Sequence, residues 1–245
     1  MSKQLIITID GPNAVGKTAA ARSLARLLGY KHVNTGAIYR AVAYASLAKG
    51  LSARDLWSIL QVTREIEISF EASGAILVNG RDLTRELYTA RTLSFTSEIA
   101  ELAPVREALL PVQRRQADGG GVVAEGRDTG TTVFPDADWK FYLDADDRRK
   151  AERVAELLDE DERRRYPDQA AIIAYIREID RRDLTRPNSP LRRADDAIFH
   201  DTTHSPTAEH DAYALYHYMF NTDCILKNSE ILRGKLEPAG RRIFR

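Results

Sequence analysis

The segment Gly11–Thr18, GPNAVGKT, follows the apolar run Leu5–Ile9 and constrains the fold more than any other feature. It has the pattern G-x-x-x-x-G-K-[ST], in which backbone amides at the start of a helix surround phosphate oxygens. Gly11 and Gly16 tolerate the backbone angles that turn these amides inward. The β-branched strand before the segment and the helical pattern Ala19–Leu28 after it are the context that this motif requires. The sequence therefore predicts a phosphate-binding loop rather than an ordinary glycine turn.

The residues of this loop have separate expected roles toward a nucleoside triphosphate. Lys17 can reach the β- and γ-phosphates, and the Thr18 hydroxyl can ligate Mg²⁺. The predicted triphosphate-binding residues are Gly11, Pro12, Asn13, Ala14, Val15, Gly16, Lys17 and Thr18. The loop leaves open which molecule receives the phosphate.

Composition narrows the class of protein. The 245 residues include 36 basic and 36 acidic side chains, so no net field attracts nucleic acid or a membrane surface. No apolar stretch approaches the ~18 residues that a membrane span needs. The single cysteine, Cys224, excludes an internal disulfide and suits a reducing cytosol. We therefore expect a cytoplasmic protein, a monomer, that binds neither nucleic acid nor membrane.

Predicted strands and helices alternate along most of the chain, which indicates an α/β fold with a parallel sheet flanked by helices. The predicted strands are Leu5–Ile9, Val122–Ala124, Trp139–Leu143 and Ala197–Asp201. The predicted helices are Ala19–Leu28, Ala41–Leu47, Leu51–Thr63, Leu93–Gln116 with an interruption near Pro104, Asp146–Arg182 with a break at Tyr166–Asp168, and Glu209–Phe220.

The pattern changes its period between Glu65 and Val78. Glu65–Phe70 alternates as a strand, and Ala75–Val78 is apolar between two turn signals. We therefore expect a small antiparallel β insertion within one P-loop domain that covers residues 1–220. The insertion is placed at about 34–118 and a helical lid at about 146–182, while 221–245 is an appendage of unknown role.

Ligands of parallel α/β sheets bind at the carboxyl ends of the strands. Three segments expected near this edge are rich in groups that bind phosphates and bases: Asn34–Arg40, Glu125–Asp136 and Arg182–Arg186.

These motifs together resemble the bacterial cytidylate kinases, which move the γ-phosphoryl group of ATP to CMP or dCMP. The matching stretches are IDGP with the phosphate loop, TGAIYR, VNGRD, PVREALLPVQR, EGRDTGTTVFPDA and RDLTR. They occur in family order and spacing from Ile9 to about Thr203. The resemblance implies ATP and Mg²⁺ as cofactors and the small molecules CMP and dCMP as substrates. It also implies that the β insertion belongs to the region that binds the nucleoside monophosphate.

The acceptor monophosphate needs cations, and a planar guanidinium can hold it as a bidentate fork. The resemblance assigns Arg40, Arg127 and Arg186 to this task. Arg106 and Asp128 could read the base, because a carboxylate accepts from the N4 amine of cytosine and repels the carbonyl of uracil. The resemblance places Asp128 there for that purpose.

The resemblance adds further residues around the acceptor nucleotide. Ser97 and Asp183 match positions that contact the nucleoside, and Thr35 and Tyr39 belong to the acceptor loop. The predicted substrate-binding set is Thr35, Tyr39, Arg40, Ser97, Arg106, Arg127, Asp128, Asp183 and Arg186. For Ser97, an ordinary serine on a helix surface explains the sequence equally well.

Phosphoryl transfer needs positioning and charge neutralisation more than a strong base. Lys17, Arg127 and Arg153 are the predicted catalytic residues, with Arg148 and Arg149 as further candidates in the lid. The charged run around these lid arginines is also typical of a solvated helix face, and both interpretations stay open.

Three departures from the family pattern bear on the acceptor. Asn34 and Glu125 each stand where aspartate is usual, and Ile179 stands where arginine is usual. Ile179 precedes Asp183 by one helical turn, so the two share a helix face. An apolar residue at this position removes one cation. Either a neighbour such as Arg182 compensates, or the acceptor differs.

Two alternatives to a kinase of CMP and dCMP follow. The first keeps the chemistry but uses a modified pyrimidine monophosphate in a specialised pathway. The second is a non-catalytic nucleotide-binding regulator, which the intact Lys17, Thr18, Arg127 and Asp128 disfavour. A GTPase is disfavoured because the sequence has no N-K-x-D segment to read guanine.

Overall fold

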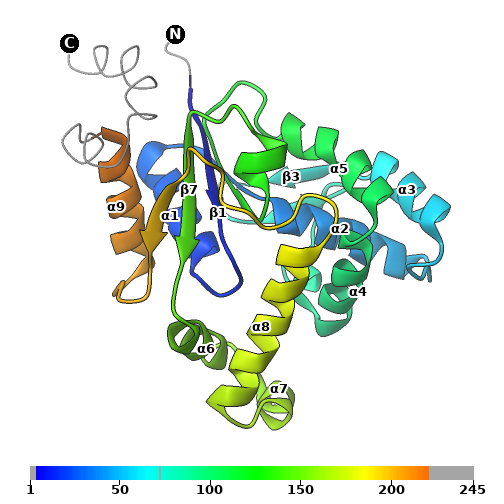
Figure 1. Cartoon of the computed structure of the whole chain (residues 1–245). Coiled ribbons are helices and arrows are strands. Elements are labelled where there is room, and N and C mark those ends of the chain that lie inside the picture. Colours follow the sequence, from blue (N-terminus) through cyan, green and yellow to red (C-terminus); the bar gives the residue numbers. More distant parts are fainter. Residues whose placement is uncertain (1–3, 72, 221–245) are drawn as a thin grey trace.

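The core of the protein is a five-stranded parallel sheet in the order β2-β6-β1-β7-β8. The structure is a computed structural model that describes residues 4–71 and 73–220. The strands of this sheet are β1 (Ile6–Asp10), β2 (Lys31–Asn34), β6 (Val122–Gly126), β7 (Trp139–Asp144) and β8 (Ile198–Asp201). Because they run in one direction, their carboxyl ends share one edge (Figure 1). This confirms the predicted α/β fold.

The central position of β1 explains where the phosphate loop emerges. Ile9 of β1 is aligned with Glu125 of β6 on one side and with Phe141 of β7 on the other. Ile7 and Ile9 on one face of β1 and Thr8 on the other have no exposed surface, so β1 is buried on both faces. The loop after β1 therefore leaves the middle of the sheet edge.

Two helices pack against each other beside the sheet, at the left of Figure 1: α1 (Lys17–Leu28) and α9 (Ala208–Phe220). Leu24 of α1 and Leu215 of α9 are fully buried in the same apolar cluster. The cluster covers one face of the sheet and holds the start of α1 beneath the phosphate loop.

The segment after α1 differs from the prediction. Lys31–Asn34 forms strand β2, which the sequence analysis did not identify, and helix α2 (Thr35–Ala48) begins six residues before the predicted Ala41. The reason is a local cap: the Asn34 side chain accepts a hydrogen bond from the Ala37 backbone amide at 2.9 Å.

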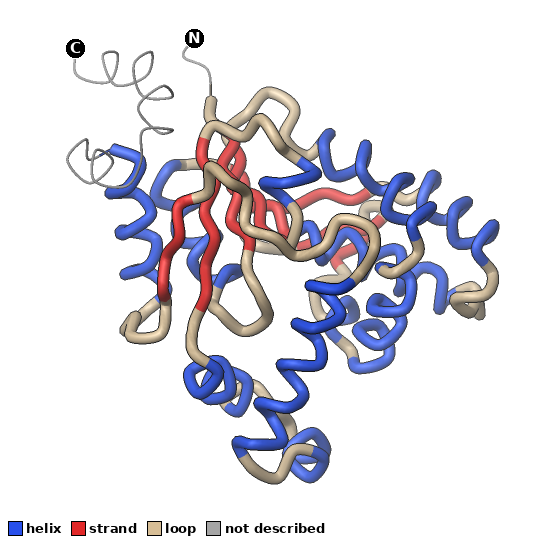
Figure 2. The backbone as a smooth tube through the Cα atoms, viewed as in Figure 1, coloured by secondary structure: helices blue, strands red, loops and turns tan. Residues whose placement is uncertain are grey.

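The β insertion is a three-stranded antiparallel sheet of β3 (Ile68–Phe70), β4 (Ile76–Val78) and β5 (Arg81–Asp82). Figure 2 shows it as a separate small sheet beside the main one, with β3 in contact with β2. The helices packed with it are α2, α3 (Leu56–Glu65), the short η1 (Glu86–Tyr88), α4 (Ala90–Ala100) and α5 (Ala103–Arg115). Buried residues such as Ile38, Leu87 and Leu109 give this region its own apolar core.

Three helices follow β7 where two were predicted: α6 (Asp147–Ala155), α7 (Glu160–Arg165) and α8 (Gln169–Thr185). The missed break lies before α7, where Asp159 and Glu162 form a reciprocal capping box. In Figure 1, α6 and α7 lie below the carboxyl ends of the strands, and α8 runs from there back up beside the phosphate loop.

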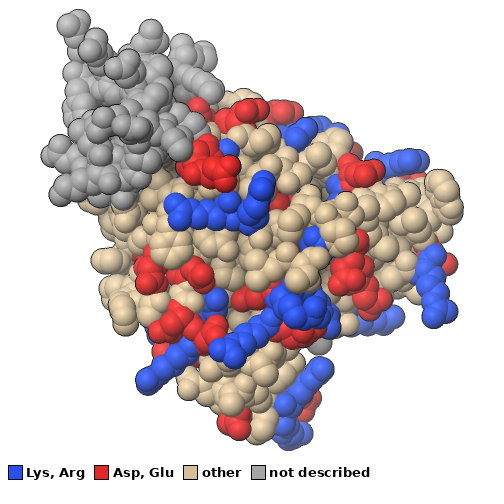
Figure 3. All heavy atoms as spheres, in the orientation of Figure 1, with Lys and Arg blue, Asp and Glu red and all other residues tan. Residues whose placement is uncertain are grey.

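On the face drawn in Figure 3, basic and acidic side chains are interspersed. None of the helices within 4–71 and 73–220 combines the length and the apolar character that crossing a bilayer requires. The predicted appendage, 221–245, lies outside the described residues.

Candidate active site

The phosphate loop packs closely against strand β7 at Gly11. Any side chain at this position would force the backbone of the loop or of β7 to move. Gly11 has φ +152°, and a Cβ built there would lie 2.1 Å from the backbone oxygen of Leu143. Gly16, at the N-cap of α1, is also left-handed, with φ +88°. Both glycines thus adopt the positive φ angles expected from the sequence, and Gly11 also allows a close approach to β7 that the sequence did not predict.

Lys17, the first residue of α1, points back into the loop. Its ammonium donates a hydrogen bond to the Pro12 carbonyl, and the side chain is buried. Burial, with the nearby charge of Arg127, lowers the pKa of Lys17 to about 7. A cation held this way is strongly attracted to any phosphate oxygen that enters the loop.

Glu125, at the end of β6, is a buried carboxylate beside the start of α1. The Thr18 hydroxyl hydrogen bonds to it, Asn34 Nδ2 donates to its Oε1 at 2.6 Å, and His32 Nε2 lies 3.6 Å from the same oxygen. Burial raises the pKa of Glu125, but these neighbours and the Lys17 charge outweigh it and hold the pKa below its usual value. Glu125 is therefore ionised near neutral pH.

Asn34 and Glu125, two of the three departures from the family pattern, are directly hydrogen-bonded to each other. An amide at Asn34 can donate to the carboxylate, whereas a carboxylate at the same position would repel it. The two departures are thus physically matched.

The oxygen atoms of Thr18 and Glu125 fit the preference of Mg²⁺ for hard oxygen ligands. Within the described residues, no cluster of three or more His, Cys, Asp or Glu could hold a metal ion. In nucleotide sites Mg²⁺ is usually held by one or two protein oxygens together with phosphate oxygens and water, and here Thr18 and Glu125 would supply the protein oxygens.

Five residues predicted for the acceptor form one chain of alternating charge. Arg106 lies 2.5 Å from Asp128, and Arg186 lies 3.9 Å from the other oxygen of Asp128. Arg186 also pairs with Asp183 at 3.1 Å, and Asp183 with Arg127 at 2.7 Å. The structure thus brings together side chains from α5, from the segment after β6, and from the last turn of α8 and the residue that follows it. We call these five residues the acceptor chain.

The acceptor chain has surplus positive charge and unused donors. It contains three arginines and two aspartates. The buried atoms Arg106 Nε and Arg186 Nη2 have no hydrogen-bond partner among the described residues. Burial, together with the Arg106 charge, lowers the pKa of Arg186. Since buried donors are normally paired, these atoms indicate a site for an anionic or hydrogen-bonding ligand.

Helix α2 places three more predicted residues nearby. The Tyr39 ring lies 5.3 Å from the guanidinium carbon of Arg106, and the Thr35 hydroxyl donates to the Glu125 carbonyl at 2.8 Å. Arg40 is stacked 4.3 Å above the Tyr88 ring and donates to its hydroxyl at 2.9 Å.

Ser97 differs from the other predicted residues. It is exposed on α4, and its hydroxyl donates to the Leu93 carbonyl of the same helix at 3.3 Å. In this arrangement the Ser97 hydroxyl is bonded within its own helix and contacts none of the five acceptor-chain residues.

Arg153 of α6 contacts the phosphate loop, unlike the two other arginines predicted for the lid. It donates to the Ala14 carbonyl at 3.4 Å and to the Thr202 hydroxyl and carbonyl at 3.0 and 2.8 Å. Arg148 and Arg149 instead pair with Glu152 of their own helix, at 3.1 and 3.3 Å. The structure thus separates Arg153 from its two neighbours, which resemble a solvated helix face.

The sequence analysis missed the buried Asp10, the last residue of β1. It accepts from the Thr129 amide at 2.9 Å, the Thr129 hydroxyl at 2.7 Å and the Gly130 amide at 2.7 Å. Burial raises the pKa of Asp10. These bonds hold η2 (Thr129–Val133), a π-helical turn that directly follows Asp128. A charged residue between an apolar strand and a phosphate loop was the signal that could have identified it.

A phosphate loop at the centre of a parallel sheet, with a cluster of arginines and aspartates beside it, is typical of the class of P-loop nucleotide phosphotransferases. Residues 7–211 match the model of one family within this class, described as cytidylate kinase. The chain belongs to the cytidylate kinase family, which confirms the resemblance stated from the motifs.

Named relatives agree with this assignment. A cytidylate kinase of Geobacter sp. (strain M21) is 39% identical over 203 residues, which cover 81% of this chain and 86% of the relative. A cytidylate kinase of Solibacter usitatus is 37% identical over 208 residues, covering 84% and 89%. One of Vibrio vulnificus is 36% identical over 208 residues, covering 83% and 91%.

Proposed function

We propose that this chain is a (d)CMP kinase that transfers the γ-phosphoryl group of ATP to CMP and dCMP, which gives CDP and dCDP. The observation that carries the proposal is the acceptor chain, in which Arg127 lies near enough to Lys17 to lower its pKa. One continuous set of charges therefore joins a base-reading pair to the cation of the phosphate loop. This also argues against a non-catalytic regulator, which needs no such alignment.

The Arg106–Asp128 pair supports cytosine as the base. Asp128 Oδ2 accepts from Arg106, and Oδ1 lies 3.9 Å from Arg186. The pair presents a carboxylate acceptor beside a guanidinium donor. Cytosine offers an amine donor at N4 beside a ring nitrogen that accepts, whereas uracil offers the opposite pattern. A cytosine base therefore satisfies both partners, and a uracil base satisfies neither.

Arg40, Arg127 and Arg186 are proposed to hold the acceptor phosphate, and Asp183 the sugar hydroxyls. Thr35, Tyr39 and Ser97 complete the proposed acceptor site. Because Asp183 also pairs with Arg127 and Arg186, the same carboxylate orients two of the phosphate-binding arginines. The region of about 34–118 is the proposed acceptor-binding part, and about 146–182 the proposed lid.

Lys17 and Arg127 are the proposed catalytic cations, because Lys17 lies in the phosphate loop and the charge of Arg127, in the acceptor chain, is near enough to lower the Lys17 pKa. Arg153 is the third, and its bond to the Ala14 carbonyl means that it also keeps the loop in shape. Mg²⁺ at Thr18 supplies further charge neutralisation on the phosphates. The protein contributes alignment and electrostatic stabilisation, which dominate phosphoryl transfer.

The test is ADP formation from Mg-ATP with CMP, dCMP, UMP and AMP offered separately. We expect fast turnover on CMP and dCMP, and turnover on UMP and AMP at least about tenfold lower in kcat/KM, the lower range for one base contact. ADP formation that does not depend on any acceptor would contradict the proposal. A Lys17→Ala protein prepared in parallel is the control for contaminating kinases.

A modified pyrimidine monophosphate is a second candidate acceptor, favoured by one observation. Ile179 lacks the cation that the family usually has, and Arg182 pairs with Glu178 of the same helix at 2.9 Å rather than with the acceptor chain. Efficient ATP binding without turnover on any of the four standard acceptors would favour this candidate.

We further propose that the protein is a cytoplasmic monomer whose substrates are small-molecule nucleotides and not nucleic acids. The single Cys224 and the equal numbers of basic and acidic residues support this. The absolute mass in solution, from light scattering of the purified protein, tests the oligomeric state.

A further inference from the structure

One peptide group of the phosphate loop is held from both of its ends. The Pro12 carbonyl accepts from Lys17, and the Asn13 amide donates to Asp180 Oδ1 at 2.7 Å. This carbonyl and this amide belong to the same planar unit, so the two contacts fix one orientation of that plane. Asp180 thereby influences the group against which the Lys17 ammonium rests.

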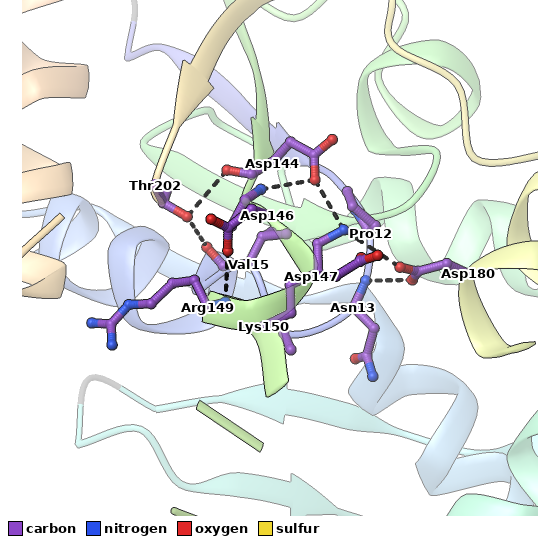
Figure 4. A network of polar contacts seen from close by, with 12 residues as sticks. Pro12, Asn13, Val15, Asp144, Asp146, Asp147, Arg149, Lys150, Asp180 and Thr202 are labelled. Atoms are coloured by element: carbon purple, nitrogen blue, oxygen red, sulfur yellow. Dashed lines mark hydrogen bonds and ion pairs between the residues drawn. The ribbon is translucent and has the colours of Figure 1, made fainter. Parts of the chain in front are cut away.

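Asp180 is not part of the loop but of helix α8, and a second cation holds it in place. Lys150 of α6, itself buried, lies 3.7 Å from Asp180 Oδ2 and 3.1 Å from Asp144 Oδ1 at the end of β7. Figure 4 shows Asp180 and Lys150 directed toward the loop at Asn13. The network therefore connects the loop with α6, α8 and the sheet.

The same helix carries acceptor-chain residues. Asp183 follows Asp180 by three positions, so the two lie on neighbouring parts of one helix face, about 4.5 Å apart along the axis. Asp183 pairs with Arg127 and Arg186. Helix α8 thus contacts the phosphate loop through Asp180 and the acceptor chain through Asp183, and a rigid helix cannot move one contact without the other.

We propose that Asp180 is a positioning residue that couples the phosphate loop to the acceptor site through helix α8. The inference rests on the proposed function, because it takes ATP as the loop ligand and CMP as the acceptor. When either nucleotide fixes α8, the Asp180–Asn13 bond pre-organises the other site. Each nucleotide therefore binds more tightly in the presence of the other, by the same factor.

The experiment measures the dissociation constant of CMP by calorimetry, with and without saturating Mg²⁺ and a non-hydrolysable ATP analogue. We expect the ratio of the two constants to be at least about 5 in the unmodified protein, the lower range of coupling between two sites. In Asp180→Ala we expect the ratio to fall below about 2. Asp180→Asn keeps an acceptor for the Asn13 amide and should retain most of the coupling.

Arg177→Ala is the matched control. Arg177 ties α8 to α6 through Asp147 at 2.7 Å, one turn before Asp180, and its side chain is largely exposed. If the coupling depends on lid stability in general, this variant loses it too, and the inference is wrong. If the coupling depends on the loop contact, Arg177→Ala keeps the ratio of the unmodified protein.

Asp180→Glu serves if the alanine variant does not fold. It keeps a charge beside Lys150 but moves the carboxylate away from the Asn13 amide, so the coupling ratio should again fall below about 2. An unmodified protein that does not bind CMP contradicts both the proposed function and the inference. One that phosphorylates CMP but shows equal coupling ratios before and after Asp180→Ala contradicts the inference alone.

Discussion

Arg106 and Asp128 form a buried ion pair, with 2.5 Å between the guanidinium nitrogen and the carboxylate oxygen. Neither group is well solvated, so each depends on the other for its charge to be tolerated in the interior. The pair belongs to two separate parts of the chain, helix α5 and the segment after β6. Its integrity therefore bears on both base recognition and stability.

Replacing Asp128 by alanine should weaken the binding of CMP much more than the binding of ATP. The loss of the carboxylate removes the acceptor for the N4 amine, which we expect to lower kcat/KM for CMP by about 10- to 100-fold. It also leaves Arg106 buried without its partner, so the free energy of unfolding should fall by about 3–5 kcal/mol. Steady-state kinetics with each nucleotide varied in turn, and denaturant unfolding, measure the two effects.

Asp128→Asn separates recognition from folding. The amide keeps the shape of the carboxylate but can donate to the uracil carbonyl, so the preference for CMP over UMP should narrow. If either variant lowers kcat/KM equally for ATP and for CMP, Asp128 does not recognise the base.

Lys17→Met should abolish turnover and yet stabilise the fold near neutral pH. Burial lowers the Lys17 pKa from 10.5 to about 7. The unfolded chain therefore binds more protons than the folded one between these two values, and stability attributable to this group rises with pH across that window. Below pH 7 the buried charge of Lys17 lowers the free energy of unfolding by its full amount, roughly 5 kcal/mol at most for a pKa shift of this size. Above pH 10.5 it vanishes.

The measurement is thermal unfolding of both proteins from pH 6 to pH 10. The excess stability of Lys17→Met over the unmodified protein should be largest below pH 7 and shrink as the pH rises. A constant difference at all pH values would mean that the Lys17 pKa is not lowered by folding. Turnover within a few-fold of the unmodified protein would remove Lys17 from catalysis.

Gly11→Ala should destabilise the fold and prevent nucleotide binding. The new Cβ would lie 2.1 Å from the Leu143 carbonyl oxygen, and backbone rather than a flexible side chain would have to move. We expect a loss of more than about 3 kcal/mol in the free energy of unfolding. Gly29→Ala is the control, because Gly29 is also left-handed but a Cβ there meets open space. Gly29→Ala should lower the free energy of unfolding by only about 1–2 kcal/mol. It should leave the affinity for ATP unchanged, which calorimetry can verify.

The sequence predicted those parts of the fold that local patterns determine. The phosphate loop needs glycine at Gly11 and Gly16 and a strand before it, and these are visible in a short window. Strand β2 was missed, because Lys31–Asn34 has polar residues at three of its four positions and is stabilised by pairing with β6. Tertiary pairing of this kind leaves little trace in the local sequence.

The residues of the candidate site also fall into those that local motifs predict and those that only the fold reveals. The arginines of the acceptor chain were identified because they lie in motifs of a family that the chain resembles. Asp10 and Asp180 were missed, because each acts on a backbone amide more than 100 residues away in the sequence, Thr129 and Asn13 respectively. A carboxylate that holds a distant amide has no signature in spacing or periodicity, and only the folded chain reveals it.

Ile179→Arg should increase the affinity for the acceptor monophosphate. Ile179 is half-buried on α8, one turn before Asp183, so an arginine there would add a cation on the side of the acceptor chain. For one added contact at this half-buried position we expect the KM for CMP to fall by about 3- to 10-fold, the range of an ordinary hydrogen bond. The gain should be larger at low ionic strength, because a partly exposed charge is screened by salt. A higher KM would mean that the apolar side chain itself contributes to binding.

Arg182→Ala decides whether the missing cation is already compensated. Arg182 is bonded to Glu178 at 2.9 Å and is about half exposed, so its removal should leave the KM for CMP unchanged. If instead the KM rises by a factor similar to the gain from Ile179→Arg, Arg182 turns toward the acceptor when CMP binds. If both variants leave the KM unchanged, the position does not face the phosphate of CMP, and a different acceptor becomes the better explanation for isoleucine at this site.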